Sequence, residues 1–373
     1  MTIHRPRYWW LICSVVVFLV SIVTIELTPI GWQDEVQIVE YGRLVSENTV
    51  EGWGMNLDND QQIPSTSILG SYGSYLASKL SNHRLFGHRL YSLMGALLCS
   101  LFMLLLGLRL KTTPVISLLV SLILLLDPLL VQGYRGGRID VWAIAFVLIA
   151  MYSFLQRSGK LSKYRYIFSG VFLGLSVFCW ISAILLFPLV IWFFFRTKEN
   201  SDKVLKSISQ SILGFFACFI LIIAFNYSFL KDALISFLYI PSSLGAEVPL
   251  STYIYRTIIL FVTSLKYSNL FFVAGLISIV LLRDIKFYFA FTLFLVGVIF
   301  SGLYEHRIVY YVPYMCVSFL LLFNQVQTTH PNRLKIFTKI IFVIFVMKFL
   351  PFGSPVIGIL IRKFNTFLNK VII

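Results

Sequence analysis

The chain has 373 residues, of which 58% are hydrophobic and 13% are charged, and its mean hydropathy is +0.85. Soluble domains are about half apolar and about a quarter charged, so this composition excludes a soluble globule and predicts a polytopic membrane protein. The net charge is +15, but the basic residues stand in short clusters between apolar runs, where they set membrane topology. This distribution argues against nucleic acid as a partner.

Apolar runs suited to a membrane recur along the whole chain. They lie near residues 8–26, 88–108, 114–131, 141–156, 166–195, 208–225, 268–282, 287–303, 308–323 and 336–350. Basic clusters flank 166–195 on both sides, so we expect this run to return as a hairpin with its tip near Trp180; one long tilted span is the alternative. The sequence thus predicts an all-α membrane protein with about 11 transmembrane helices in a single domain, 1–373.

The charge pattern also orients the chain. Basic clusters alternate with acidic or mixed loops, which predicts that the N-terminus lies in the cytoplasm. The long outer segments are then 27–87, expected to carry short interfacial helices, and 226–267, whose run "YIYRTIILFVTSLKY" is expected to lie along the interface. The tail 351–373 is too short and too basic to assign.

Polar groups recur at four outer boundaries of the predicted spans. They are Asp34 with Glu35, the stretch "YRGGRID" (134–140), the hairpin tip, and "LYEHRIVYYVP" (303–313). Ionisable residues at a membrane edge usually face a cavity or one another, so four such groups on one side suggest a site. Simpler interpretations stay open: Asp140 as an N-terminal cap of its helix, Arg307 as an interfacial anchor, and Asp34 with Glu35 as caps of an expected helix over 34–47.

The order of these motifs resembles that of the membrane-embedded GT-C glycosyltransferases. The match rests on "QDE", "FGHRLYSLMGALLCSLFMLLLGLRL", "GGRIDVWAIAFVLIAMYSF" and "HRIVYYVPY", in register over about residues 8–325. The similar families are the protein O-mannosyltransferases (glycosyltransferase family 39) and the aminoarabinose transferases that modify lipid A. The resemblance implies a GT-C fold with its active site at the outer face of the plasma (inner) membrane. It also implies that a sugar is transferred, with inversion, from a polyprenyl-phosphate donor embedded in the membrane lipid to an envelope lipid, glycan or protein.

The resemblance also implies roles for three acids. Asp34 stands where the family has its first-loop catalytic acid, the base that accepts the acceptor proton. Glu35 would orient or assist it. Asp140 matches the second-loop acid, which organises the acceptor, a metal or an arginine.

The leaving group of such a reaction is an anionic lipid phosphate, so cations must lie near it. The candidates are Arg138, His306 and Arg307. The sequence does not decide whether a divalent metal is a cofactor, because no residue pattern requires one.

The chain departs from the aminoarabinose transferases at two motifs. The places of their Glu-Lys-Pro and Thr-Lys-Gly are occupied by "QQIPSTS" and "CWISA", so Pro64 is kept and neither lysine is. The sugar therefore cannot be carried over, and acceptor recognition is expected from 27–87, 226–267 or a partner.

Other functions remain as alternatives. A transporter would carry acids near the bilayer centre, but Asp127 in "LLLDPLL" is expected to mark a proline-induced break. A polysaccharide polymerase or O-acyltransferase is a second possibility, for which an embedded histidine such as His306 would be the signature. A non-catalytic assembly factor is the third.

Overall fold

The computed structural model describes residues 4–25, 33–47, 67–82, 84–155, 162–196, 201–225, 272–300 and 305–329, with a few single positions between 255 and 339. Within these ranges every regular element is helical and there is no strand, which confirms the all-α class. The α-helices are α1 (His4–Thr24), α2 (Gln33–Glu47), α3 (Ile68–Leu80), α4 (Arg84–Arg109), α5 (Pro114–Leu125), α6 (Pro128–Arg135), α7 (Asp140–Phe154), α8 (Arg165–Cys179), α9 (Phe187–Arg196), α10 (Ser201–Phe225), α13 (Ile285–Phe300) and α14 (Tyr311–Thr329). Short 3-10 helices are η2 (Ser162–Tyr164), η3 (Ile181–Leu186) and η4 (Glu305–Tyr310).

The number of helices long and apolar enough to cross a membrane is four among the described residues. They span Pro6–Thr24, Leu85–Arg109, Leu205–Ile222 and Ile308–Thr329, and a bent pair, α5 with α6, makes up to five. The expected count of about 11 is therefore not confirmed. Several apolar runs form helices that are too short, such as α7 with 15 residues and α9 with 10. The run 336–350 and the segments 226–267 and 351–373 lie essentially outside the described residues.

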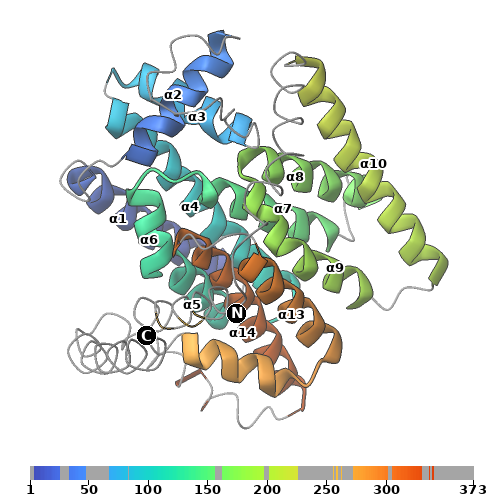
Figure 1. Ribbon diagram of the computed structural model, residues 1–373. Coiled ribbons are helices and arrows are strands. Elements are labelled where there is room, and N and C mark those ends of the chain that lie inside the picture. The colour runs from blue at the N-terminus through green and yellow to red at the C-terminus, as the bar shows by residue number, and fades with distance from the viewer. Residues whose placement is uncertain are drawn as a thin grey trace.

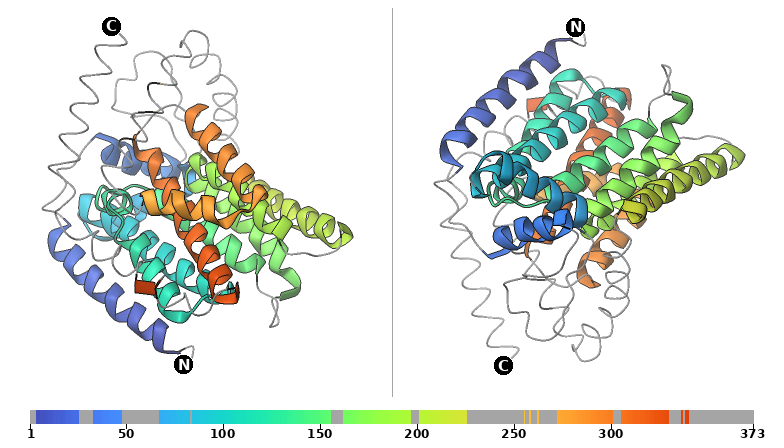
Figure 2. Two further views of the ribbon diagram at one scale, coloured as in Figure 1. Left: turned by 90° about the horizontal axis from the view of Figure 1, so that it is seen from below. Right: turned by 90° about the horizontal axis from the view of Figure 1, so that it is seen from above.

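Burial separates central from peripheral helices. In the window of Ile308–Thr329, 89% of residues are buried, against 11% for Pro6–Thr24. Large apolar side chains of α1 and α10 are exposed, and both helices lie at the rim of the bundle in Figure 2. In a membrane protein such apolar faces contact lipid rather than water, which is compatible with the predicted membrane environment.

A bend interrupts the third apolar run at the expected place. The axes of α5 and α6 meet at 51°. Pro128 begins α6, and the Asp127 carboxylate caps it by accepting a hydrogen bond from the backbone N–H of Leu129 at 2.9 Å. The prediction that Asp127 marks a proline-induced break is confirmed.

The run 166–195 also breaks where a turn was expected. Helix α8 ends at Cys179, and Trp180 is extended before η3 begins. The Phe154 ring, at the end of α7, contacts Tyr166 near the start of this run and Phe194 near its end, with centroid separations of 5.2 and 4.4 Å. The run thus returns to where it began, as a hairpin does, and one continuous tilted span is excluded.

Helices α2 and α3 form a cap over one end of the bundle (Figure 1). They cross closely, because a Cβ on Gly42 would lie 2.0 Å from the carbonyl oxygen of Ser71. Helix α3 approaches α4 in the same way, with Gly87 against the carbonyl of Ala77. Short helices expected within 27–87 are therefore present, and they pack onto the start of α4.

Candidate functional site

The first of the predicted acidic groups lies in the first turn of α2. Asp34 follows the first residue of this helix, and its side chain lies outside the described part of the structure. Glu35 is completely buried and pairs with Arg89 of α4. Arg89 Nη2 is 3.0 and 3.1 Å from the two carboxylate oxygens of Glu35, and Arg89 Nε is 3.3 Å from one of them. Glu35 therefore holds an arginine.

Arg89 connects three segments of the chain. Its Nη1 donates a 2.6 Å hydrogen bond to the carbonyl of Ile25, directly after α1, while Nε and Nη2 bind Glu35. Burial raises the pKa of Glu35 above its ordinary value of 4.5, and the hydrogen bond and charge of Arg89 offset part of that rise. One guanidinium thus fixes the start of α2, and with it the backbone of Asp34, to the bundle.

The second predicted group forms another buried ion pair. Arg138 Nε donates to Asp140 Oδ2 at 2.8 Å, and the Tyr310 hydroxyl donates to Asp140 Oδ1 at 3.0 Å. Asp140 is the first residue of α7, where a carboxylate suits the helix dipole, but Ile139 occupies the N-cap position. Simple capping therefore does not account for Asp140, because its two oxygens bind side chains from the preceding turn and from η4.

A histidine lies between the two ion pairs. His88 precedes Arg89 on α4 and is fully buried. A Cβ on Gly137, whose φ is +63°, would lie 2.2 Å from ring atoms of His88, so the turn carrying Arg138 rests directly on the imidazole. His88 therefore connects the helix that carries Arg89 with the turn that carries Arg138.

The hairpin tip meets the same end of the bundle. A Cβ on Gly70 of α3 would lie 2.7 Å from the carbonyl oxygen of Cys179 and 2.9 Å from Ile139. The Trp180 indole Nε1 is buried without a hydrogen-bonding partner among the described residues. Helix α3, the tip and the start of α7 thus converge beside Asp140.

The fourth group is placed by its backbone. His306 and Arg307 belong to η4, whose last residue is Tyr310, the partner of Asp140. Their side chains lie outside the described part of the structure. Of the predicted residues, Arg138 and Asp140 contact each other and Glu35 contacts Arg89, whereas Asp34, His306 and Arg307 are placed by their helices alone.

Three residues of this cluster had no role assigned from sequence. Arg89 and His88 stand in the motif "FGHRLYS", where a charge at the head of an apolar run was a usable signal for Arg89. Nothing in the local sequence distinguishes His88 or Tyr310, because their roles depend on contacts with the 137–140 turn.

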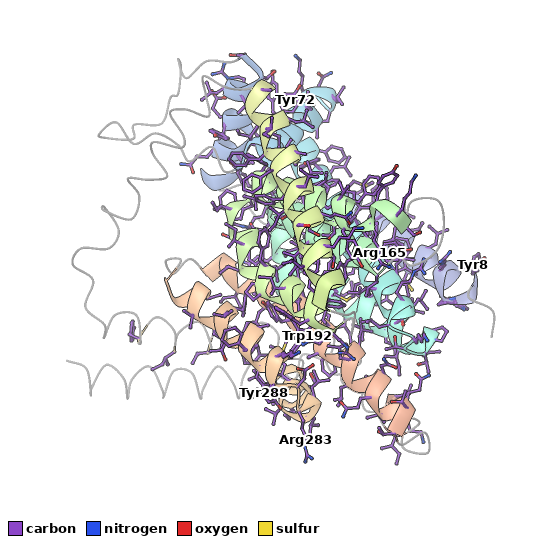
Figure 3. All side chains as sticks on the ribbon, turned by 90° about the vertical axis from the view of Figure 1, so that its right-hand side faces the viewer. Tyr8, Tyr72, Arg165, Trp192, Arg283 and Tyr288 are labelled. Atoms are coloured by element: carbon purple, nitrogen blue, oxygen red, sulfur yellow. The ribbon has the colours of Figure 1, made fainter. Side chains whose placement is uncertain are left out.

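The opposite end of the bundle carries polar contacts of a different kind. Asp284 Oδ1 caps α13 by accepting from the backbone N–H groups of Lys286 and Phe287, and its Oδ2 accepts from Trp192 Nε1 at 3.1 Å. The Arg196 guanidinium lies 5.0 Å from the Trp192 ring centroid. Figure 3 shows Trp192 near the Arg283 end of the molecule, far from Tyr72 of α3. These contacts join α9 to α13.

No group of three or more His, Cys, Asp or Glu side chains capable of holding a metal occurs among the described residues. Comparisons of the chain with protein-family models, curated proteins and solved structures give no match.

Proposed function

We propose that this protein is an inverting membrane glycosyltransferase of the GT-C type, with about 11 spans, acting at the outer face of the plasma membrane. It would transfer a sugar from a polyprenyl-phosphate donor to an envelope lipid, glycan or protein. The observation that carries this proposal is the buried polar cluster at one end of an apolar helix bundle: Glu35 with Arg89, His88, and Arg138 with Asp140 and Tyr310. Buried charges on this scale are costly and usually functional.

The two acids of α2 have different tasks in this proposal. Glu35 is engaged by Arg89 through both carboxylate oxygens, so it orients the helix rather than accepting a proton. Asp34, the next residue toward the helix start, is the base that takes the proton of the acceptor hydroxyl as that oxygen attacks the anomeric carbon. General-base assistance contributes about 10²- to 10⁴-fold in rate.

The predicted cations also have different tasks in this proposal. Arg138 is neutralised by Asp140 at 2.8 Å, so this pair adds no net charge for a departing phosphate. His306 and Arg307, which precede Tyr310 in η4, supply the charge that stabilises the leaving lipid phosphate. Asp140 then links the two parts, because it binds Arg138 from one side and Tyr310 from the other.

The proposal is tested with Asp34→Asn in the purified full chain. Synthetic citronellyl phosphates bearing mannose, glucose, galactose or aminoarabinose serve as donors, detergent-extracted bacterial envelope serves as acceptor, and released citronellyl phosphate is measured. We expect Asp34→Asn to slow release about 10²- to 10⁴-fold while donor binding and the thermal midpoint stay near those of the parent.

Glu40→Gln is the matched control, because Glu40 is another acid of α2 and pairs only locally with Arg43 among the contacts defined here. It should retain the parent rate. A folded Asp34→Asn protein that releases lipid phosphate at the parent rate contradicts the assignment of the base, and a parent inactive with all four donors contradicts the proposed function.

A further inference from the structure

His88 carries two polar atoms that the fold does not use. The side chain is fully buried, and neither Nδ1 nor Nε2 has a hydrogen-bonding partner among the described residues. In neutral imidazole one ring nitrogen donates and the other accepts. Leaving a buried polar group unpaired costs about 1–3 kcal/mol. The structure therefore keeps an unused donor and an unused acceptor inside the polar cluster.

His88 adjoins a member of each ion pair along the chain or through a chain neighbour. Arg89, bound to Glu35, is the next residue on α4, and the ring edge lies against Gly137, which precedes Arg138. Ser92 lies one helical turn further along the same face of α4. It is also fully buried, and its hydroxyl has no partner within the described ranges. Two unsatisfied polar side chains thus share one face of the helix.

The unpaired donor and acceptor of the His88 ring indicate which kind of ligand could bind there. An ionised phosphate oxygen only accepts, and an ammonium only donates, so either would satisfy one ring nitrogen and leave the other unpaired. Hydroxyl groups both donate and accept. Among the reactants of the proposed transfer, the sugar carries several neighbouring hydroxyls and can satisfy both nitrogens.

We propose that His88 binds hydroxyl groups of the transferred sugar and thereby contributes to the choice of sugar. This inference rests on the proposed function and deepens it. The turn at Gly137 covers the ring, so this binding requires the turn to move away from His88. Glycine suits such a turn, because it adopts positive φ, as Gly137 does, without the clash that a side chain brings.

The experiment uses the purified full chain and the citronellyl-phosphate donors. The best of the four sugars is compared with analogues in which one hydroxyl at a time is replaced by hydrogen. In the parent, we expect at least one deoxy donor to lower kcat/KM about 10- to 100-fold, since an unpaired polar group is then left in the site. His88→Leu removes both ring nitrogens at similar volume, so it should process the complete and the deoxy donor at equal, reduced rates.

His88→Gln should keep much of the discrimination, because its amide retains one donor and one acceptor function. Thr112→Val is the control: it removes a buried hydroxyl just after the far end of α4, and discrimination should stay at the parent value. If His88→Leu fails to fold, His88→Met takes its place as an apolar variant with a more adaptable side chain.

Equal discrimination in the parent and the apolar His88 variant would overturn the assignment of His88 while leaving the proposed function intact. A parent that releases lipid phosphate from none of the donors refutes the proposed function and this inference together. Loss of discrimination in the apolar variant alone, with rescue by His88→Gln, is the result expected.

Discussion

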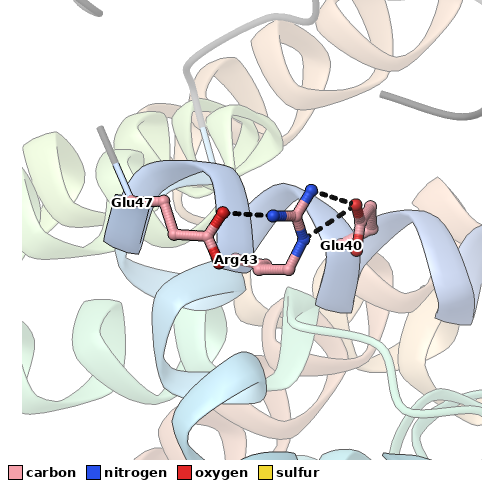
Figure 4. Close-up of polar contacts among 3 residues, drawn as sticks. All are labelled: Glu40, Arg43 and Glu47. Carbon is pink, nitrogen blue, oxygen red and sulfur yellow. Dashed lines mark hydrogen bonds and ion pairs between the residues drawn. The ribbon is translucent and has the colours of Figure 1, made fainter. Parts of the chain in front are cut away.

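The two ends of α2 hold their charges in opposite ways. At its start, Glu35 is fully buried and binds Arg89, which is 54 residues away in sequence. Toward its end, Arg43 binds Glu40 at 2.7 Å and also Glu47, all within the same helix and partly exposed (Figure 4). Both arrangements are ion pairs, but only the first joins separate helices.

The two kinds of ion pair differ in hydration and in the cost of losing one partner. The exposed pairs at i,i+3 and i,i+4 stay hydrated, so they gain little from the attraction of opposite charges. The buried pair has lost its water, and removal of one partner leaves the other charge in an apolar surrounding. The buried start of α2 is therefore the sensitive end, and the exposed end is the tolerant one.

The largest effect is expected from Arg89→Met. This change leaves the Glu35 carboxylate buried without its cation and removes the contact with the Ile25 carbonyl, at an expected cost of about 3–5 kcal/mol in the free energy of unfolding. Thermal or denaturant unfolding in detergent micelles measures it. A loss no larger than that of an exposed variant would break the comparison.

The same variant carries a pH signature. Burial raises the folded-state pKa of Glu35 above its ordinary value of 4.5. The contribution of Glu35 to the free energy of unfolding is therefore fully present below pH 4.5 and is lost as the pH rises through the folded-state pKa. Without Arg89, the pKa rises further. The deficit of Arg89→Met relative to the parent should therefore be larger at pH 8 than at pH 5, and a deficit independent of pH would contradict the pairing.

An intermediate effect is expected from Tyr310→Phe. The hydroxyl donates to the buried Asp140 carboxylate at 3.0 Å, and hydrogen bonds to charged groups contribute about 1.5–3 kcal/mol. The ring and its packing remain, so unfolding experiments report the hydrogen bond itself. If stability is unchanged, Asp140 does not depend on η4, and the second buried pair resembles the exposed end of α2 more than its start.

The smallest effect is expected from Arg43→Gln. Its partners Glu40 and Glu47 are solvated and lie on the same helix, so the thermal midpoint should stay at the parent value within error. The rate of the proposed sugar transfer should also stay at the parent value. A clear loss of stability would show that the exposed end of α2 is as sensitive as the buried end.

The same contrast explains what the sequence could predict. The break at Asp127–Pro128 and the turn at Trp180 depend on neighbouring residues and on local charge, and both were predicted. The bond between Tyr310 and Asp140 joins residues 170 positions apart, which no local pattern encodes. The expected count of about 11 spans is not confirmed among the described residues, because four or five of their helices are long and apolar enough to cross a membrane. Hydropathy alone does not distinguish one long helix from two short helices packed inside the protein.

The place of α14 in the bundle has a consequence for biosynthesis. This helix is deeply buried and packs against α5, yet it is made only after the ribosome has passed residue 310. Until then α5 can pack against α4 but not against α14, and Asp140 lacks the hydroxyl of Tyr310. The earlier helices are therefore made before the core is complete, and the bond between Tyr310 and Asp140 can form only after both partners of the Glu35–Arg89 pair have been made.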